Sequence, residues 1–432
     1  MDTRVRRILG LCGLLAAALM LPVSASAAER DPQTILASEA FAKAQTHMAA
    51  EHDRTVEDIV TITEIPAPPF KEAARAAAYL EMLKAHGLAD TVQDDEGNVM
   101  GLRRGAGPAG GPVVVVSAHL DTVFPEDVDV TVRRQGTMLM APGVGDDSRS
   151  LAVLLAFIRA LDAAGIRTER DLLFVGTVGE EGQGDLRGVR HLFTQGAYKD
   201  RIESFFSFDG ADPARIVNGA VGSKRYRATF HGPGGHSYGA FGIVNPMAAM
   251  ARATARLYEI DPPARPRTTY SASVTGGGVS VNSIPAEVFT EYDMRSESPA
   301  ALADLEAKLL SIFQTAVAEE NAARSPRQGE VRVEAKLIGD RPAGGTPQDS
   351  PFITGVAGAI AALGFQPSFS ASSTDANIPM SLGIPAATLG SGGRAGRAHA
   401  LDEWIDVEPV ESVRGMSAGL LAILTAAGVA TP

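Results

Sequence analysis

Continuous apolar runs alternate along much of the chain with stretches in which apolar residues recur at helical spacing. Short runs rich in β-branched or aromatic residues are typical of strands buried on both faces of a mostly parallel sheet. Such runs occur at residues 111–118, 172–178, 205–208 and 386–389. Helical spacing covers residues 39–64, 71–86, 151–164, 351–363 and 410–427. Strands that alternate with helices in this way predict an α/β sandwich.

The pattern changes in the middle of the chain. Residues 225–231 alternate between apolar and polar side chains, as a half-exposed strand does. The elements that follow complete a β-α-β-β-α-β order, with strands at 225–231, 269–274, 288–295 and 330–337 and helices at 246–260 and 300–323. This order predicts a compact α+β unit at residues 223–341. It is inserted into an α/β domain formed by residues 28–222 and 342–432.

The first residues have the pattern of a secretory signal peptide. Three arginines, Arg4, Arg6 and Arg7, precede an apolar stretch at residues 8–21, and small residues follow at 25–27. We therefore expect residues 1–27 to be removed and the mature protein to be secreted, in the periplasm, with no membrane attachment. An uncleaved anchor is the alternative, although the apolar run is shorter than the ~20 residues of a spanning helix.

Composition excludes several classes of function. The single cysteine, Cys12, lies in the predicted signal peptide, so the mature chain has no thiol for catalysis, disulfides or zinc ligation. The formal charge of −12 argues against a nucleic-acid partner, because binding a polyanion requires a basic face. With 45% hydrophobic and 21% charged residues, the chain of 432 residues is an ordinary globular protein.

Histidines and acidic residues follow the predicted buried strands. In open α/β sheets, ligands bind at the carboxyl ends of the strands, where residues distant in sequence converge. The residues at these positions are His119, Asp146, Glu180, Glu181, Asp209 and His399. Each alone is more often a helix cap or a solvated charge, but adjacent buried glutamates are costly unless a cation compensates them. Imidazoles and carboxylates without thiolates suit a catalytic zinc site, and two zinc ions require a bridging carboxylate.

Five segments carry a resemblance to a known family: residues 117–123 (SAHLDTV), 145–147 (GDD), 179–182 (GEEG), 234–237 (GGHS) and 282–285 (NSIP). They resemble the motifs of the co-catalytic zinc hydrolases that include aminoacylase, carboxypeptidase G, succinyl-diaminopimelate desuccinylase and peptidase T. The resemblance spans essentially the whole mature chain. It implies a phosphorylase/hydrolase-like, three-layer α/β catalytic domain with a mixed, mostly parallel sheet. The insert would be a ferredoxin-like α+β lid and dimerisation domain, through which a homodimer would form.

The resemblance also implies a role for each residue of the predicted site. The ligands of two zinc ions would be His119 and Asp209 for one ion, Glu181 and His399 for the other, and Asp146 as the bridge. Glu180 would be the general base, and Asp121 would hydrogen-bond the far nitrogen of His119. Asp209 stands where many relatives have glutamate, although the peptidase T-like branch also has aspartate. Nitrogen and oxygen ligands also accept cobalt or manganese.

Three lid residues are implied in substrate handling. His236 would donate a hydrogen bond to the developing oxyanion, often across a dimer interface, and lid closure would bring it over the metals with Arg295. Arg295 and Asn282 are candidates for binding a substrate carboxylate. The alternatives are a plain loop histidine for His236 and a cross-strand salt bridge for Arg295. Asp375 lies in a segment that also resembles the family, but no chemical role is assigned to it.

The predicted function is hydrolysis of amide bonds in small peptides or N-acyl amino acids, of the exopeptidase or dipeptidase type. One alternative is a serine esterase, because Gly235-His236-Ser237-Tyr238-Gly239 matches the G-x-S-x-G motif, with Asp375 or Asp402 and His399 as partners. Glycines and a proline separate this serine from the flanking strand and helix, which a nucleophile elbow does not tolerate. The other alternative is a non-catalytic binding protein with the same fold.

Overall fold

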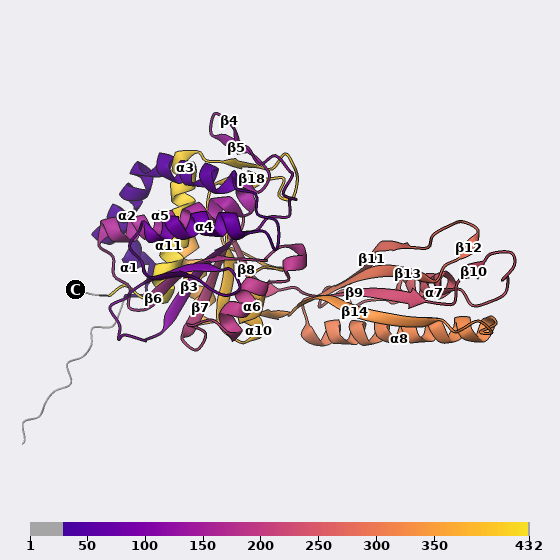
Figure 1. The fold of residues 1–432 in the computed structure, drawn as a ribbon. Helices are drawn as coiled ribbons and strands as arrows, with labels where there is room; N and C mark the ends of the chain where they lie inside the picture. The colour runs from indigo at the N-terminus through magenta and orange to yellow at the C-terminus, as the bar shows by residue number, and fades with distance from the viewer. Residues whose placement is uncertain (1–28, 431–432) are drawn as a thin grey trace, which may run out of the picture.

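The computed structural model describes residues 29–430, and the predicted signal peptide lies outside them. Two units are visible in Figure 1: a rounded α/β domain, called the catalytic domain below, and a narrow lid domain that projects from it. The lid begins at β9 (Gly222–His231) and ends at β14 (Arg332–Arg341). Both ends of the lid therefore enter the catalytic domain at the same place.

The catalytic domain is built on one large mixed sheet. Its strand order is β1-β2-β6-β3-β7-β17-β8-β15, with β16 beside β8. The central strands β6, β3, β7 and β17 are parallel, whereas β1, β2, β8 and β15 introduce antiparallel pairs. The bounds are β1 Ala89–Gln93, β2 Val99–Arg103, β3 Val113–His119, β6 Asp171–Thr177, β7 Ile202–Phe208, β8 Arg215–Ala220, β15 Gly344–Gly345, β16 Ser368–Ser372 and β17 Ala386–Leu389. The predicted mixed, mostly parallel sheet is confirmed.

Helices cover both faces of this sheet. One face packs against α1 Pro32–Leu36, α2 Glu39–Ala50, α3 His52–Thr63, α4 Ala73–Lys84, α5 Arg149–Ala164, α9 Pro351–Ala362 and α11 Pro409–Ala427. The other packs against α6 Arg187–Thr194 and α10 Asn377–Ser381. Strand β3 contributes to the cores on both faces of the sheet. Val114 and Val116 belong to one core, and Val113 and Val115 belong to the other. A strand with two buried faces has no polar alternation, and the sequence shows none.

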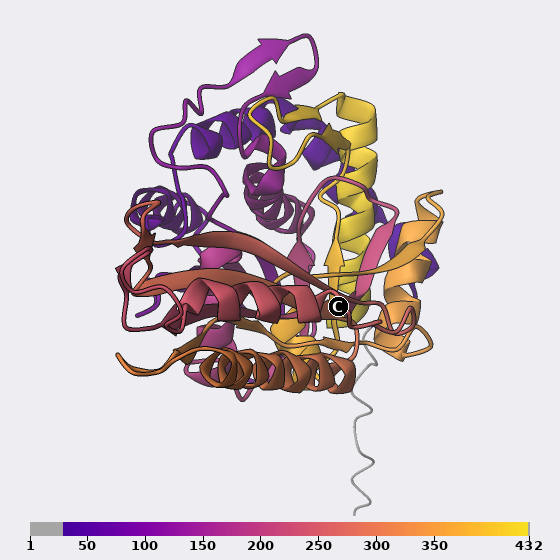
Figure 2. The same ribbon diagram turned by 90° about the vertical axis from the view of Figure 1, so that its right-hand side faces the viewer.

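The lid is a four-stranded antiparallel sheet with two helices. Its strand order is β11-β13-β9-β14, which is the order of a ferredoxin-like fold. The further elements are α7 Pro246–Leu257, β11 Thr268–Gly277, β13 Glu287–Ser296 and α8 Pro299–Ala323, with short strands β10 Gly235–His236 and β12 Ser283–Ile284 paired at the tip. Figure 2, which looks toward the lid, shows α7 and α8 running side by side. Alternate residues of β13 are buried, facing these helices.

A small second sheet lies beside the carboxyl edge of the large one. It contains β4 Arg133–Gln135, β5 Met138–Met140, β18 Arg394–Gly396 and β19 Trp404–Asp406. The sequence pattern did not predict these strands, because each has three residues, too few for a periodicity to show. The loops around this sheet carry two of the predicted metal ligands, Asp146 and His399.

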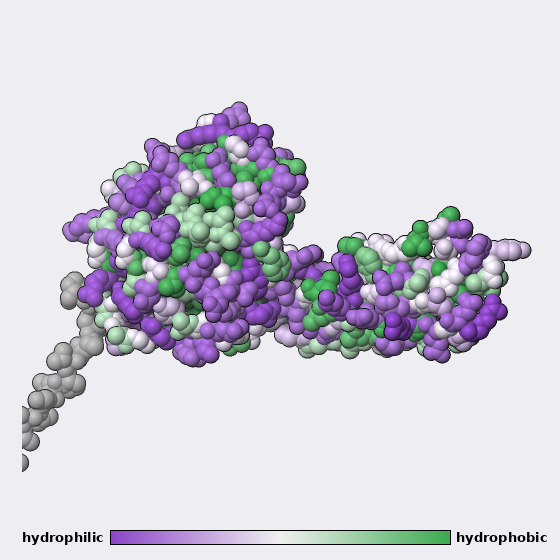
Figure 3. Space-filling model, in the orientation of Figure 1, coloured by the Kyte–Doolittle hydropathy of each residue, from purple (hydrophilic) through white to green (hydrophobic). Residues whose placement is uncertain are grey.

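Among the described helices, α11 is the one with the length and hydropathy of a membrane span. Most of it is buried in the catalytic domain, where its residues belong to the larger core. In Figure 3 the visible face of the catalytic domain is largely hydrophilic, with small apolar areas between the polar ones.

Candidate metal centre and active site

The carboxyl ends of three parallel strands place the predicted ligands at one edge of the sheet. His119 is the last residue of β3, Asp209 follows β7 directly, and Glu181 lies on the loop after β6. Since β3 pairs in parallel with both β6 and β7, these three ends lie next to each other. Asp146 and His399 approach from loops of the small sheet. The structure brings all five predicted ligands together.

Asp146 lies at the centre of this cluster. Its Oδ1 is 2.9 Å from Nε2 of His119, and its Oδ2 is 3.2 Å from Nε2 of His399. The same nitrogen of His399 is 2.8 Å from Oε1 of Glu181. His119 also belongs to a second group of possible ligands, with Asp147 and Asp209, whose atoms lie within 4.8 Å of one another. Each carboxylate oxygen of Asp146 thus faces a different histidine.

These spacings fit divalent metal ions. Ligand atoms about 2.0–2.2 Å from a tetrahedral zinc ion lie about 3.3–3.6 Å from each other, so small outward shifts of the donor atoms here would admit an ion. The donor pairs above are 2.8–3.2 Å apart, and they consist of imidazole nitrogens and carboxylate oxygens. Among the described residues, His119 takes part in both groups that could hold an ion. The residues therefore fit the two-metal site that the family resemblance implies.

The electrostatics of the cluster show an excess of buried carboxylate. Burial, together with the charge of the neighbouring Asp146, raises the pKa of Asp209 to about 7. Burial opposes protonation of His119, but the carboxylates of Asp147 and Asp146 outweigh it and hold the pKa of His119 well above its usual value. Hydrogen bonds to Asp146 and Glu181 raise the pKa of His399 to about 10. A cluster that stabilises added positive charge at both histidines is suited to cations.

Asp121 acts differently from the prediction. Nδ1 of His119 is 2.9 Å from the backbone carbonyl of Asp121, whereas the nearest carboxylate oxygen is 3.8 Å away. The carboxylate instead accepts hydrogen bonds from the backbone N–H groups of Glu180 and Glu181, at 3.0 and 2.8 Å. The predicted contact to the ring is thus made by the main chain. Two N–H groups at the strand end, which otherwise lack partners, hold the buried carboxylate.

Two further acids support the cluster, and sequence analysis assigned no role to either. Glu403 is almost completely buried and accepts hydrogen bonds from the N–H groups of Gly143, Gly145 and Asp146, at 2.9, 2.8 and 2.8 Å. Asp147 accepts one from the N–H of His119, at 3.0 Å. Glu403 fixes the loop that carries Asp146. The only signal in the sequence is its proximity to His399, which is too weak to single it out.

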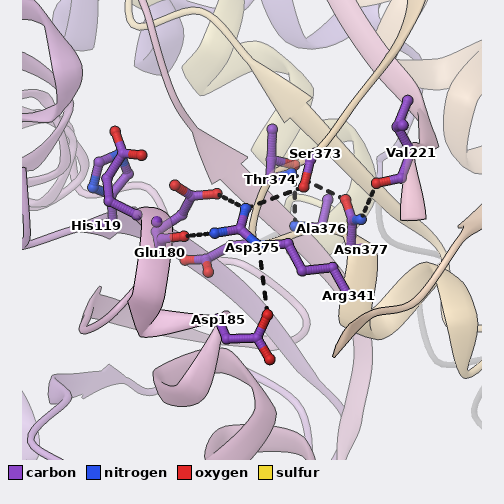
Figure 4. A network of polar contacts seen from close by, with 12 residues as sticks. His119, Glu180, Asp185, Val221, Arg341, Ser373, Thr374, Asp375, Ala376 and Asn377 are labelled. Carbon is purple, nitrogen blue, oxygen red and sulfur yellow. Dashed lines mark hydrogen bonds and ion pairs between the residues drawn. The ribbon is translucent and has the colours of Figure 1, made fainter. Parts of the chain in front are cut away.

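Glu180 lies beside the ligands and contacts a buried arginine. The guanidinium of Arg341 lies 3.4 Å from Oε1 of Glu180 and also donates to the backbone carbonyl of Glu180 and to Oγ of Ser373 (Figure 4). Burial raises the pKa of Glu180 well above its usual value, and the positive charge of Arg341 opposes this shift. Arg341 ends β14, the last strand of the lid. Sequence analysis missed this residue.

A cavity of about 420 Å³ opens over the cluster. Its lining includes Asp146, Glu180, Glu181, Asp209, His399 and the predicted substrate ligand Arg295. Arg295 pairs with Asp293 of its own strand at 2.8 Å, so the salt bridge exists but is not the cross-strand one considered above. The lid base therefore contributes a cationic wall to the cavity.

The structure does not bring His236 and Asn282 to this cavity. Both are exposed at the lid tip, where Ser237 N–H donates to the carbonyl of Asn282. Arg295 pairs with Ser223 at the lid base, and β9 then runs to His231 before the tip begins. Ten residues of strand span about 33 Å. In Figure 1, β10 and β12 accordingly lie at the end of the lid remote from the catalytic domain.

The serine esterase alternative does not agree with the structure. Ser237 lies at the lid tip after a two-residue strand, without the strand-to-helix turn of a nucleophile elbow. His399, its supposed partner, contacts Glu181 and Asp146 instead. Asp375 is buried in the catalytic domain, where its carboxylate accepts a hydrogen bond from Thr177. Within residues 29–430, no catalytic triad is assembled around Ser237.

Comparison with known proteins agrees with this geometry. The model of peptidase family M20/M25/M40 matches residues 115–424. Among solved structures, the chain is similar to aminopeptidase PepT from Bacillus cereus, with 20% identity, a TM-score of 0.68, and 86% of this chain and 98% of that chain covered. A tripeptidase from Staphylococcus aureus has 19% identity and a TM-score of 0.70, with 87% and 99% covered.

The YXEP protein of Bacillus subtilis, described as a dinuclear metal binding peptidase from the M20 family, has 16% identity and a TM-score of 0.62, with 88% of this chain and 99% of that chain covered. At these identities the solved structures establish the shared fold. No curated protein sequence gives a significant match. The family model covers well over half of the chain. The chain therefore belongs to peptidase family M20/M25/M40 and is an enzyme of the metallopeptidase type.

Proposed function

We propose that the mature protein is a secreted, periplasmic di-zinc hydrolase that cleaves amide bonds in small peptides or N-acyl amino acids, with Glu180 as the general base. The observation that carries the proposal is the arrangement of Asp146, whose two oxygens face His119 and His399 separately, with Glu180 on the same cavity wall. A carboxylate placed in this way can bridge two ions. Secretion is inferred from residues 1–27, and an N-terminus near Ala28 on the exported protein would test it.

The proposed ligand assignment is the one that the family resemblance implies. His119 and Asp209 would hold one ion, Glu181 and His399 the other, and Asp146 would be shared. Bound there, zinc ions would polarise a carbonyl group and increase the acidity of water; cobalt or manganese could supply the same chemistry. Asp121 and Glu403 accept hydrogen bonds from backbone N–H groups of the segments that carry Glu181 and Asp146.

Glu180 has the environment that a proton acceptor and donor requires. It is 5% exposed and lines the cavity, so it can reach a small molecule while bulk water is largely excluded. Burial favours its protonated form and Arg341 favours its ionised form. Burial is the larger effect and raises the pKa of Glu180, which suits a group that must take up a proton and later deliver it.

A small substrate fits the dimensions and charge of the cavity. A volume of about 420 Å³ accommodates a few residues. Arg295 at the lid base would bind the terminal carboxylate, for which a guanidinium is the suited partner. The names of two similar structures, an aminopeptidase and a tripeptidase, point to short peptides.

The position of His236 supports a homodimer formed through the lid. Four large apolar side chains near the tip are 79% exposed or more: Tyr238, Phe241, Val279 and Val281. A second chain bound there would cover them, and β11 offers a free strand edge for the contact. His236 and Asn282, remote from the cavity of their own chain, would then serve the cavity of the partner.

The test combines metal removal with substitution of the base. A chelator should abolish hydrolysis of dialanine, and zinc should restore it. Glu180→Gln should keep wild-type zinc content, because Glu180 is not a ligand, and should lose about 10²–10⁴-fold in turnover. Hydrolysis that survives chelation would exclude metal catalysis. Full activity in Glu180→Gln would exclude Glu180 as the general base but would leave metal catalysis unaffected.

A further inference from the structure

The cavity over the metal cluster is lined by four arginines as well as by the four carboxylates of Asp146, Glu180, Glu181 and Asp209. Four guanidinium groups line it, those of Arg215, Arg225, Arg295 and Arg341. Arg225 and Arg295 share one carboxylate, that of Asp293, at 3.1 and 2.8 Å. Arg341 faces Glu180. Asp293 carries a single negative charge, so it can neutralise only one of Arg225 and Arg295.

Within the described part of the chain, Arg215 differs from the other three arginines in having no ion-pair partner. It begins β8 in the catalytic domain, half-buried, and its Nε donates to Oγ of Ser370 at 3.3 Å. Within residues 29–430 no carboxylate lies within the 4.0 Å of an ion pair with it. A half-buried guanidinium that lines a cavity and forms no ion pair is suited to an anionic ligand.

Arg215 lines two neighbouring cavities. A second cavity of about 370 Å³ shares Asp209 and Arg215 with the first and is further lined by Arg394 and Trp404. Arg394 differs from Arg215 because Asp406 neutralises it at 2.8 Å. Asp212, also on this wall, accepts a hydrogen bond from the N–H of Ala214 and forms no ion pair with Arg215. Among the described residues, Arg215 thus lies between the metal cluster and the second cavity without an ion-pair partner, although its charge lowers the pKa of the nearby Asp209.

We propose that Arg215 binds a second carboxylate of the substrate, so that the preferred substrates are dicarboxylic: short peptides or N-acyl amino acids with an aspartate or glutamate side chain. The inference rests on the proposed function and deepens it, since Arg295 would bind the terminal carboxylate and Arg215 the additional one. The matching amide is a poor replacement, because it offers one accepting oxygen and no charge to a group that only donates.

The additional carboxylate could belong to the residue on either side of the scissile bond, and matched substrates separate these cases. The zinc-loaded mature protein is assayed for kcat/KM with Glu-Ala against Gln-Ala and with Ala-Glu against Ala-Gln. Dialanine serves as the neutral reference. We expect one acidic peptide to exceed its amide partner by roughly 10- to 100-fold, the range of a charge-assisted hydrogen-bond pair.

Three variants identify the residue responsible. Arg215→Gln should abolish the preference, Arg215→Lys should retain part of it, and Arg394→Gln should leave it unchanged, because Asp406 already neutralises Arg394. Zinc content is measured in each. If Arg215 acted only on the nearby ligand Asp209, Arg215→Gln would lower zinc affinity and depress activity on all five peptides equally, and the proposal would be wrong.

A binding measurement keeps this inference separate from the proposed function. Calorimetry compares glutarate with its monoamide on the wild type and on Arg215→Gln. Tighter binding of glutarate that Arg215→Gln removes supports the inference even if no peptide is hydrolysed, in which case the proposed function fails alone. Hydrolysis of dialanine together with equal rates for acid and amide partners overturns the dicarboxylate preference and leaves the peptidase proposal intact.

Discussion

Glu403→Gln tests whether a buried acid outside the metal site controls the position of Asp146. One carboxylate oxygen of Glu403 accepts from both Gly145 and Asp146, and the other accepts from Gly143. Glutamine retains one accepting oxygen and directs an NH₂ group at the remaining N–H. At least one of the three bonds is lost and the others lose their charge, at about 1.5–3 kcal/mol for each charged hydrogen bond. Part of this lost free energy destabilises the native position of the loop that carries Asp146.

The expected result is a 10- to 100-fold weaker zinc affinity, the effect typical of removing groups that orient metal ligands. Zinc is titrated into metal-free protein against a chromophoric chelator at about pH 8, above the pKa of about 7 to which burial raises Glu403. The matched control is Asp402→Asn, the adjacent acid, which is exposed and pairs with Arg397 at the surface. Wild-type zinc affinity in Glu403→Gln would refute the argument that Glu403 holds Asp146 in place.

Two further variants address the lid. Arg341→Met should lower kcat by at least about 10-fold with unchanged zinc content, because it removes the charge beside Glu180 and the hydrogen bond to its carbonyl. The comparison is Arg190→Met, because Arg190 donates to the backbone carbonyls of Asp185 and Asp340 and pairs with the Asp185 carboxylate, without a contact to Glu180. Val281→Asp should shift the protein from dimer to monomer in analytical ultracentrifugation and lower turnover with it, and an active monomer would contradict a shared His236.

The parts of the site that sequence could predict depend on buried strands. β3, β6 and β7 are long apolar runs, so both the strands and the residues at their carboxyl ends were recognisable. His119, Asp209 and Glu181 therefore followed from the pattern of the chain itself, before any family resemblance was considered. The prediction worked because the geometry of a parallel sheet fixes where strand ends meet, regardless of the distance between them in sequence.

The parts that sequence could not predict depend on single charged residues brought together by tertiary structure. Arg341 meets Glu180 across 161 residues, and Glu403 meets the Asp146 loop across 257 or more. Nothing next to either residue in the sequence distinguishes it from a solvated surface charge. The proposed role of Arg215 could not be predicted either, because it depends on the absence of an ion-pair partner among the described residues. Such roles become visible only when burial and neighbours are known.

The distance between His236 and the cavity of its own chain follows from strand length. Polar alternation predicted strands at residues 225–231 and 269–274, whereas the structure extends them to Gly222–His231 and Thr268–Gly277. At about 3.3 Å per residue, a seven-residue strand spans about 23 Å and a ten-residue strand about 33 Å. The longer lid carries its tip beyond the cavity of its own chain, and both lid connections lie at the opposite end. Reorientation at that base keeps His236 a full strand length from Arg295, so the role proposed for the histidine requires a second chain.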